Sequence, residues 1–128
     1  KKKKKKDVPG FQLNINLTPQ FMKKFLAGDQ AIQESENFTV MSDGVDTRVV
    51  INYASVNTNR VDIPVKTSKV SGINNVSFKA KYFSEILRAN SECSSATLEV
   101  AEDGLSRLKF KVDDYTVTYY VVAVQDVD

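Results

Sequence analysis

The sequence predicts an α+β fold in which a strand–helix–strand–strand–strand unit occurs twice, with two helices on one face of an antiparallel sheet. Three observations support this prediction. Segments 11–65 and 76–124 both begin with alternating apolar and polar residues, continue with an amphipathic stretch, and then reach an Asp-Gly pair. Equivalent features are about 60 residues apart, and such self-similarity indicates an internal duplication.

The opening strand of each unit has an apolar residue at every second position. Successive side chains of a strand point to opposite faces, so this alternation is typical of a strand that is covered on one face. The apolar positions are Leu13, Ile15 and Leu17 in the first unit, and Val76, Phe78 and Ala80 in the second.

A helix is predicted after each opening strand, over 18–28 and 81–90. Thr18 suits the N-cap, Pro19 the first turn, and Gly28 the C-terminus of the first helix. In the second helix, Lys81, Ser84, Glu85 and Arg88 are expected to point away from the core. The expected core faces are Phe21, Met22, Phe25 and Leu26, and Tyr82, Phe83, Ile86 and Leu87.

Each unit then contains a hairpin and a last strand. The hairpin turns are predicted at Asp43-Gly44 and Asp103-Gly104, because these residues tolerate the positive φ that tight turns require. The return strands match through Val49, Ile51 and Tyr53 and through Leu108, Phe110 and Val112. The last strands are expected at Val61–Val65 and at Tyr115–Val124.

Length and charge indicate one domain with a basic tail. The 128 residues suit a single domain, 11–128, that follows a tail or linker remnant at 1–10. Without the six N-terminal lysines, 12 basic and 16 acidic side chains leave a net charge of −4. Any nucleic-acid contact therefore requires a local basic face. We interpret the lysines as a solvated tail, with a specific nucleic-acid-binding arm as the alternative.

The composition argues against an enzyme and against a metal site. Histidine is absent, and Cys93 is the single cysteine, so the usual zinc ligands and the commonest general base are missing. Four aspartates could serve a metal-dependent nuclease, but each fits a predicted turn. They are Asp43, Asp103, Asp113 and Asp114. No catalytic residue, metal or cofactor is predicted.

No membrane segment is predicted either. An apolar run of the roughly 20 residues that a membrane helix needs is absent, and the N-terminal lysines are followed by no apolar stretch of a secretory signal. The single cysteine is compatible with a reducing compartment. We therefore expect a cytoplasmic protein that makes no membrane contact.

The exposed faces of the two predicted helices carry Lys23, Lys24, Lys81 and Arg88. Such residues commonly serve solubility. The alternative is that the helices face the phosphates of duplex DNA, since phosphate contacts position a protein without reading sequence. Glu85 lies among these cations and favours loose contact over tight binding.

Two stretches resemble the sliding clamps of DNA polymerases, which include proliferating cell nuclear antigen and the clamps of T-even-type bacteriophages. Residues 77–87 look like the second helix of a clamp domain. Residues 119–124, with the acidic 125–128 behind them, are similar to the end of a phage clamp. The resemblance extends over nearly the whole chain beyond Gly10.

The resemblance implies a DNA polymerase processivity factor. Clamp subunits close head-to-tail into a homo-oligomeric ring of six such domains, which encircles duplex DNA without reading its sequence. The implied partners are the polymerase, a clamp loader and, for phage clamps in the host cytoplasm, the transcription machinery. Carried over by position, the pocket for a partner peptide would involve Tyr120, Val122, Ala123, Val124, Gly104 and Leu105.

Two questions stay open, the extent of the subunit and its role. The chain has room for only one clamp domain, so it is a fragment, a separately produced domain, or a one-domain form that needs six copies. The N-terminal ten residues favour the C-terminal domain of a larger subunit. For the role, the alternative to a processivity factor is a clamp-like interaction module without a replicative role, such as a transcription coactivator or a checkpoint-type ring subunit.

Overall fold

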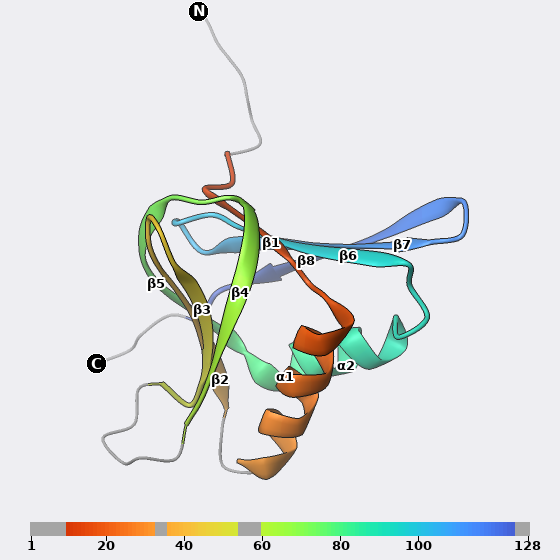
Figure 1. The fold of residues 1–128 in the computed structure, drawn as a ribbon, viewed down its shortest axis with the longest axis horizontal. Coiled ribbons are helices and arrows are strands. Elements are labelled where there is room, and N and C mark those ends of the chain that lie inside the picture. The colour runs from red at the N-terminus through yellow and green to blue at the C-terminus, as the bar shows by residue number, and fades with distance from the viewer. Residues whose placement is uncertain (1–9, 33–35, 54–59, 125–128) are drawn as a thin grey trace, which may run out of the picture.

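The computed structural model describes residues 10–32, 36–53 and 60–124. Two units follow one another along the chain, each with a strand, a helix and three more strands (Figure 1). This order confirms the predicted duplication. The first unit contains β1 (Leu13–Asn16), α1 (Pro19–Ala31), β2 (Asn37–Asp43), β3 (Thr47–Ile51) and β4 (Val61–Lys69). The second contains β5 (Gly72–Lys79), α2 (Ala80–Ala89), β6 (Ser95–Val100), β7 (Leu105–Val112) and β8 (Tyr115–Val122).

The eight strands form one curled antiparallel sheet in the order β5-β2-β3-β4-β1-β6-β7-β8. The first strand of each unit pairs with the second strand of the other, since β1 pairs with β6 and β5 pairs with β2. This exchange ties the two units into a single domain with pseudo-twofold symmetry. Both helices lie on the same side of the sheet and contact each other (Figure 1).

The two ends of the sheet are joined beyond β8. The backbone N–H of Ala123 donates to the carbonyl of Gly104 at 2.7 Å, and that of Val124 donates to the carbonyl of Ser77 in β5 at 2.8 Å. The equivalent join in the first unit is a ladder between β4 and β1. The hydrogen bond from Val124 to Ser77 of β5 is therefore the counterpart, in the second unit, of the pairing of β4 with β1 in the first.

An aromatic cluster fills the space between helices and sheet. Phe25 of α1 packs edge-on against Phe38 of β2 and Phe83 of α2, with ring centroids 5.2 and 4.8 Å apart. Phe78 of β5 extends the cluster at 5.6 Å from Phe38. All four rings are buried. Truncating one such ring to alanine typically costs about 3–5 kcal/mol, so this cluster contributes much of the stability that holds the helices in place.

The start of α1 is as predicted, but its end is not. Thr18 is the N-cap, since its Oγ1 accepts a hydrogen bond from the Phe21 N–H at 3.0 Å, and Pro19 is the first helical residue. The helix continues past Gly28 to Ala31, so the assignment of Gly28 to the C-terminus is wrong. A Cβ on Gly28 would lie 3.0 Å from Ile51 Cδ1. The glycine allows the helix to approach the sheet, which a sequence pattern cannot distinguish from a helix end.

Two predictions for α2 are wrong. Tyr82 is 56% exposed and lies outside the core, whereas Ser84 is buried and donates a hydrogen bond to Asp29 Oδ2 of α1 at 2.8 Å. The helix begins at Ala80, one residue earlier than predicted, and its buried positions are Ala80, Phe83, Ser84 and Leu87. That spacing defines one helical face, and it leaves Tyr82 outside.

The predicted hairpin turns are confirmed. Gly44 and Gly104 have φ values of +95° and +109°, which favour glycine because it has no Cβ. The third predicted turn, at Asp113, also has a positive φ of 54° and connects β7 to β8. Tyr53, expected in the return strand, lies beyond it because β3 ends at Ile51.

Candidate functional site

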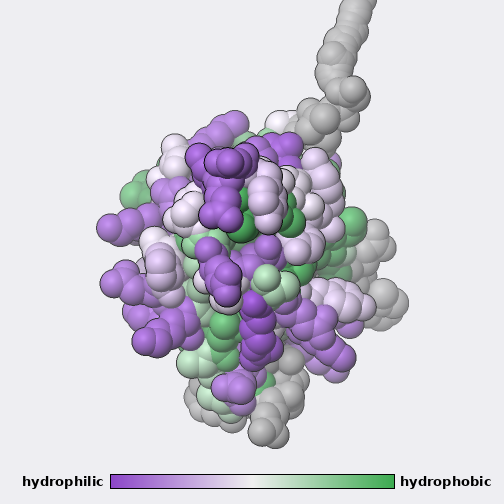
Figure 2. All heavy atoms as spheres, turned by 90° about the vertical axis from the view of Figure 1, so that its right-hand side faces the viewer, coloured by the Kyte–Doolittle hydropathy of each residue, from purple (hydrophilic) through white to green (hydrophobic). Residues whose placement is uncertain are grey.

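The four predicted DNA-facing cations are all exposed. Lys23 and Lys24 lie on α1, and Lys81 and Arg88 lie on α2. The two helices that carry these cations share one side of the sheet. Figure 2 shows that hydrophilic side chains cover most of the side that faces right in Figure 1, with small apolar areas between them.

The orientation of the two helices is set by contacts beneath the cations. Ser84 of α2 bonds to Asp29 of α1, and Phe25 stacks edge-on against Phe83 one layer deeper. A hydrogen bond to a charged acceptor contributes about 1.5–3 kcal/mol. These contacts fix α1 and α2 relative to each other.

The predicted peptide-pocket residues are brought together in space. Leu105 and Val122 are direct cross-strand neighbours in β7 and β8. The Ala123 N–H bonds to the Gly104 carbonyl, and a Cβ on Gly104 would lie 3.2 Å from the Ala123 Cβ. The hairpin before β7 and the end of β8 therefore lie side by side.

These residues nevertheless belong to two faces of the sheet. Val117, Tyr119, Val121 and Ala123 pack against the core. Tyr120 and Val122 are 60% and 69% exposed on the opposite face. The alternation expected for six consecutive apolar residues is therefore present. Only Tyr120, Val122 and Leu105 form an accessible patch, and Ala123 supports it from the inner side.

A charged network borders this patch. Arg107, the cross-strand neighbour of Tyr120, places its Nε 2.7 Å from Glu99 Oε1 and its guanidinium 4.6 Å from the centre of the Phe11 ring. Lys109 Nζ lies 3.7 Å from the same Glu99 oxygen. Burial opposes ionisation of Glu99, but the hydrogen bond and charge of Arg107 outweigh it and hold the pKa below its usual value. The network fixes Arg107 flat beside the patch.

A groove that the sequence did not reveal runs between α2 and β8. Its volume is about 550 Å³. Tyr82, Ile86 and Ala89 form its helix side, and residues 119–122 form its strand side. Asn90 Nδ2 donates to the Tyr119 hydroxyl at 3.0 Å and holds the floor. The groove was missed because Tyr82 was assigned to the core.

The first unit has an equivalent groove between α1 and β4. Gln20, Phe21 and Lys24 line its helix side and residues 63–66 its strand side, and its volume is about 170 Å³. The pseudo-twofold symmetry therefore places a helix–strand groove at both ends of the molecule. Each groove lies beside a strand that can pair with a further strand. β8 is the last strand of the sheet, and among the described residues Val61–Val65 of β4 pair only with β3.

The candidate catalytic carboxylates serve turns. Asp43 Oδ1 accepts hydrogen bonds from the N–H groups of Val45 and Asp46, both at 2.8 Å, and Asp103 Oδ1 accepts from Leu105 N–H at 3.3 Å. Residues 10–32, 36–53 and 60–124 contain no group of three or more Cys, Asp or Glu placed to hold a metal ion. In the same part of the chain, neither helix has the length and apolar character that crossing a membrane requires.

Comparison with known proteins identifies the fold. No family model matches the sequence, and no curated protein matches it. The architecture is that of the DNA sliding clamps. It is similar to the beta subunit of DNA polymerase from Streptococcus pyogenes, with 14% identity and a TM-score of 0.61, and to the DNA polymerase III beta subunit from Thermotoga maritima, with 13% identity and a TM-score of 0.69.

Each match covers 94% of this chain but only 33% and 32% of the two subunits. The chain therefore spans about a third of their length. This likeness confirms the predicted fold. The closer relation to T-even-type phage clamps stays a prediction.

Proposed function

We propose that this chain is a domain of a ring-forming DNA sliding clamp that acts as a polymerase processivity factor and catalyses no reaction. The observation that carries the proposal is the duplicated clamp fold with both helices on one side of the sheet and four exposed cations on those helices. In a ring, that side would face the central hole. Location in the cytoplasm is part of the same proposal.

DNA contact would be electrostatic and independent of sequence. Lysine and arginine side chains neutralise phosphates and release counterions, whatever the bases are. Four cations on two short helices can make only a few such contacts, and Glu85 on the same exposed surface of α2 weakens the attraction. The arrangement suits a ring that is retained by encirclement and slides on the duplex.

Ring closure would join the two ends of the domain. We infer that the α2–β8 groove of one domain meets the α1–β4 groove of the next, with β8 pairing against the free edge of Val61–Val65. Contact between two different surfaces repeats head-to-tail and closes into a ring when the rotation permits. Pairing would also satisfy the exposed backbone groups of an edge strand. Six domains, from copies of this chain or from a longer chain, would complete the ring.

The polymerase would bind through a short peptide at Leu105, Tyr120 and Val122, so that this site adjoins the ring contact, because Tyr120 and Val122 also line the α2–β8 groove. Tyrosine beside exposed aliphatic side chains is typical of the centre of a protein interface. Arg107, held by Glu99, offers a positive charge at the border of this patch. A clamp loader and the transcription machinery are further expected partners. A coactivator-type module would bind its peptide at this same patch without needing DNA.

A four-site variant tests the DNA-facing assignment. Lys23, Lys24, Lys81 and Arg88 are changed to alanine, and binding to a labelled duplex is measured by fluorescence anisotropy over a salt series. We expect weaker binding at low salt and a salt dependence reduced by up to about four units of log–log slope, because each phosphate contact contributes about 0.9. Circular dichroism checks that the variant folds.

The matched control removes four exposed or half-exposed lysines from strands. Lys66, Lys69, Lys109 and Lys111 lie on β4 and β7. Changing these four to alanine subtracts the same charge from the molecule. If the control weakens binding as much as the helix variant does, net charge governs binding and the helices do not face DNA.

A further inference from the structure

A depression lies on the first unit's sheet, on the face turned away from the helices and at the end of the β2–β3 hairpin. Its volume is about 560 Å³. A row of side chains crosses the floor: Met41 of β2, Arg48 of β3 and Pro64 of β4 are cross-strand neighbours, and Asn75 of β5 lines the same space. The turn residues Val45 and Asp46 form the rim. Pro64 also lines the α1–β4 groove of the proposed ring contact, whereas Met41, Arg48 and Asn75 do not.

The rim presents an apolar side chain to solvent. Val45 is 80% exposed, and Met41, Pro64 and Val65 lie around the same depression. Covering a valine side chain completely stabilises a complex by about 1.5–3 kcal/mol. An aliphatic side chain that entered the depression would remove Val45 and its neighbours from water together.

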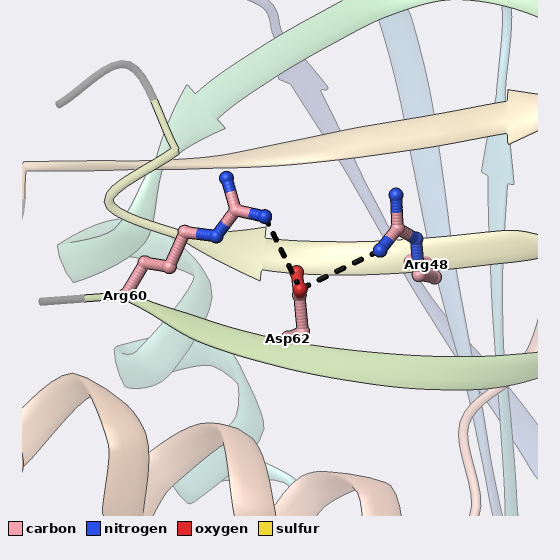
Figure 3. A network of polar contacts seen from close by, with 3 residues as sticks. All are labelled: Arg48, Arg60 and Asp62. Atoms are coloured by element: carbon pink, nitrogen blue, oxygen red, sulfur yellow. Dashed lines mark hydrogen bonds and ion pairs between the residues drawn. The ribbon is translucent and has the colours of Figure 1, made fainter. Parts of the chain in front are cut away.

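The arginine in the depression is already compensated. Arg48 NH1 and Arg60 NH2 each lie 3.5 Å from Asp62 Oδ2, and Figure 3 shows the two guanidinium groups pointing at the carboxylate from opposite sides. Both pairs are partly exposed, so they contribute little stability. They do place a counter-charge beside Arg48 and reduce its attraction for an acidic ligand.

The rim has an excess of negative charge. Asp43 and Asp46 flank Val45, and both line the depression. Hydrogen bonds from the N–H groups of Asp46 and Val45 hold the pKa of Asp43 below its ordinary value, so it is ionised at neutral pH. A basic side chain would therefore be attracted to the rim.

Under the internal duplication, this depression occupies the position in the first unit that the polymerase-peptide patch occupies in the second. In the first unit, Arg48 precedes Val49, whose cross-strand neighbour is Ile63. In the second unit, Arg107 precedes Leu108, whose cross-strand neighbour is Tyr119. Arg48 and Arg107 are therefore equivalent, as are their cross-strand neighbours Pro64 and Tyr120. Each unit has two cations around one carboxylate, Arg48 and Arg60 at Asp62 and Arg107 and Lys109 at Glu99, and the first-unit depression adds two rim aspartates, Asp43 and Asp46.

We propose that this depression binds an extended peptide segment of a partner protein in which an aliphatic residue lies beside a basic residue. The aliphatic side chain packs against Val45 and Met41, and the basic side chain faces Asp46. The site shares Pro64 and Val65 with the α1–β4 groove of the proposed ring contact, and it is separate from the peptide patch of the second unit. The clamp domain thus has two docking sites of opposite charge preference, one on each repeat.

The test uses a defined probe, an acetylated and amidated Gly-Lys-Leu-Lys-Leu-Gly peptide with a fluorescent label. Binding to the full chain is measured by anisotropy, and the bound surface is mapped by amide chemical shifts. We expect shifts at Met41–Arg48 and Asn75. Val45→Ser and Asp46→Lys should each lower the affinity by about tenfold, as loss of roughly 1.4 kcal/mol predicts. Asp46→Lys should also improve binding of the same peptide with glutamate in place of lysine.

The matched control is Val70→Ser, which truncates another exposed valine, between β4 and β5 and outside the lining of the depression. It should leave the affinity for the lysine peptide unchanged. The proposal is overturned if no shift occurs at the depression with millimolar peptide, if the shifts map to Leu105 and Tyr120 instead, or if the glutamate peptide binds the unmodified chain as well as the lysine peptide does. Failure of this site would leave the ring and its DNA contact untouched.

Discussion

At Gly28, α1 lies against β3 and β4 without room for a side chain. A Cβ there would lie 3.0 Å from Ile51 Cδ1 and 3.3 Å from both methyl groups of Val61. We expect Gly28→Val to destabilise the domain by about 1–3 kcal/mol, because the added methyl groups overpack the contact. Urea unfolding measures the effect. Ala27→Val, one residue earlier on the exposed side of α1, is the control and should change stability by less than about 1 kcal/mol. A loss for Gly28→Val no larger than that for Ala27→Val would contradict overpacking, because valine has a better helix propensity than glycine and a poorer one than alanine.

Glu99 makes stability depend on pH in the acid range. Its pKa is lowered in the folded protein, where the Arg107 interaction outweighs burial. A carboxylate with a depressed pKa stabilises the fold above its unfolded pKa, near 4.5, and loses that contribution as the pH falls through the folded value. We expect Glu99→Gln to cost about 1 kcal/mol at pH 7, and less and less below about pH 4.5. A cost that stays constant from pH 7 to pH 3 would contradict this role.

At the scale of the elements, the proposed ring contact joins the two helix–strand grooves. Tyr82 lies on the wall of the α2–β8 groove beside Glu85. We expect Tyr82→Glu to prevent head-to-tail association, because a second carboxylate would be buried without a partner at the contact. Light scattering over a concentration series gives the mass. Val70→Glu, which changes another exposed apolar residue between β4 and β5, should leave the mass unchanged. An oligomer that survives Tyr82→Glu would exclude this groove from the interface.

Sequence patterns predicted the elements better than their burial. Thr18, Pro19 and the two Asp-Gly turns act on the backbone of their immediate neighbours, and the structure confirms each of them. Tyr82 and Ser84 were wrongly assigned because the rotation of a helix about its axis depends on what packs against it. Ser84 is buried because Asp29, which is 55 residues away in the chain, accepts its hydrogen bond.

For the whole molecule, encirclement predicts retention that depends on topology. We expect protein assembled at low salt on a closed circular duplex to stay bound when the salt is raised, since screening removes phosphate contacts but does not open a ring. Cutting the circle with a restriction enzyme should release it within minutes. Retention is measured by gel filtration with the DNA. Equal loss from circular and linear DNA at high salt would contradict the ring and favour the interaction module.

The sequence by itself determined the duplication, the order of the elements and the positions of the turns, because these depend on residues that are close together in the chain. It also placed four cations on two helices. Only the tertiary structure decided which surfaces those helices and strands leave open. The exchange of β1 and β5 between the units, the two grooves and the depression beside Val45 all depend on residues far apart in sequence, and their positions follow from packing in three dimensions.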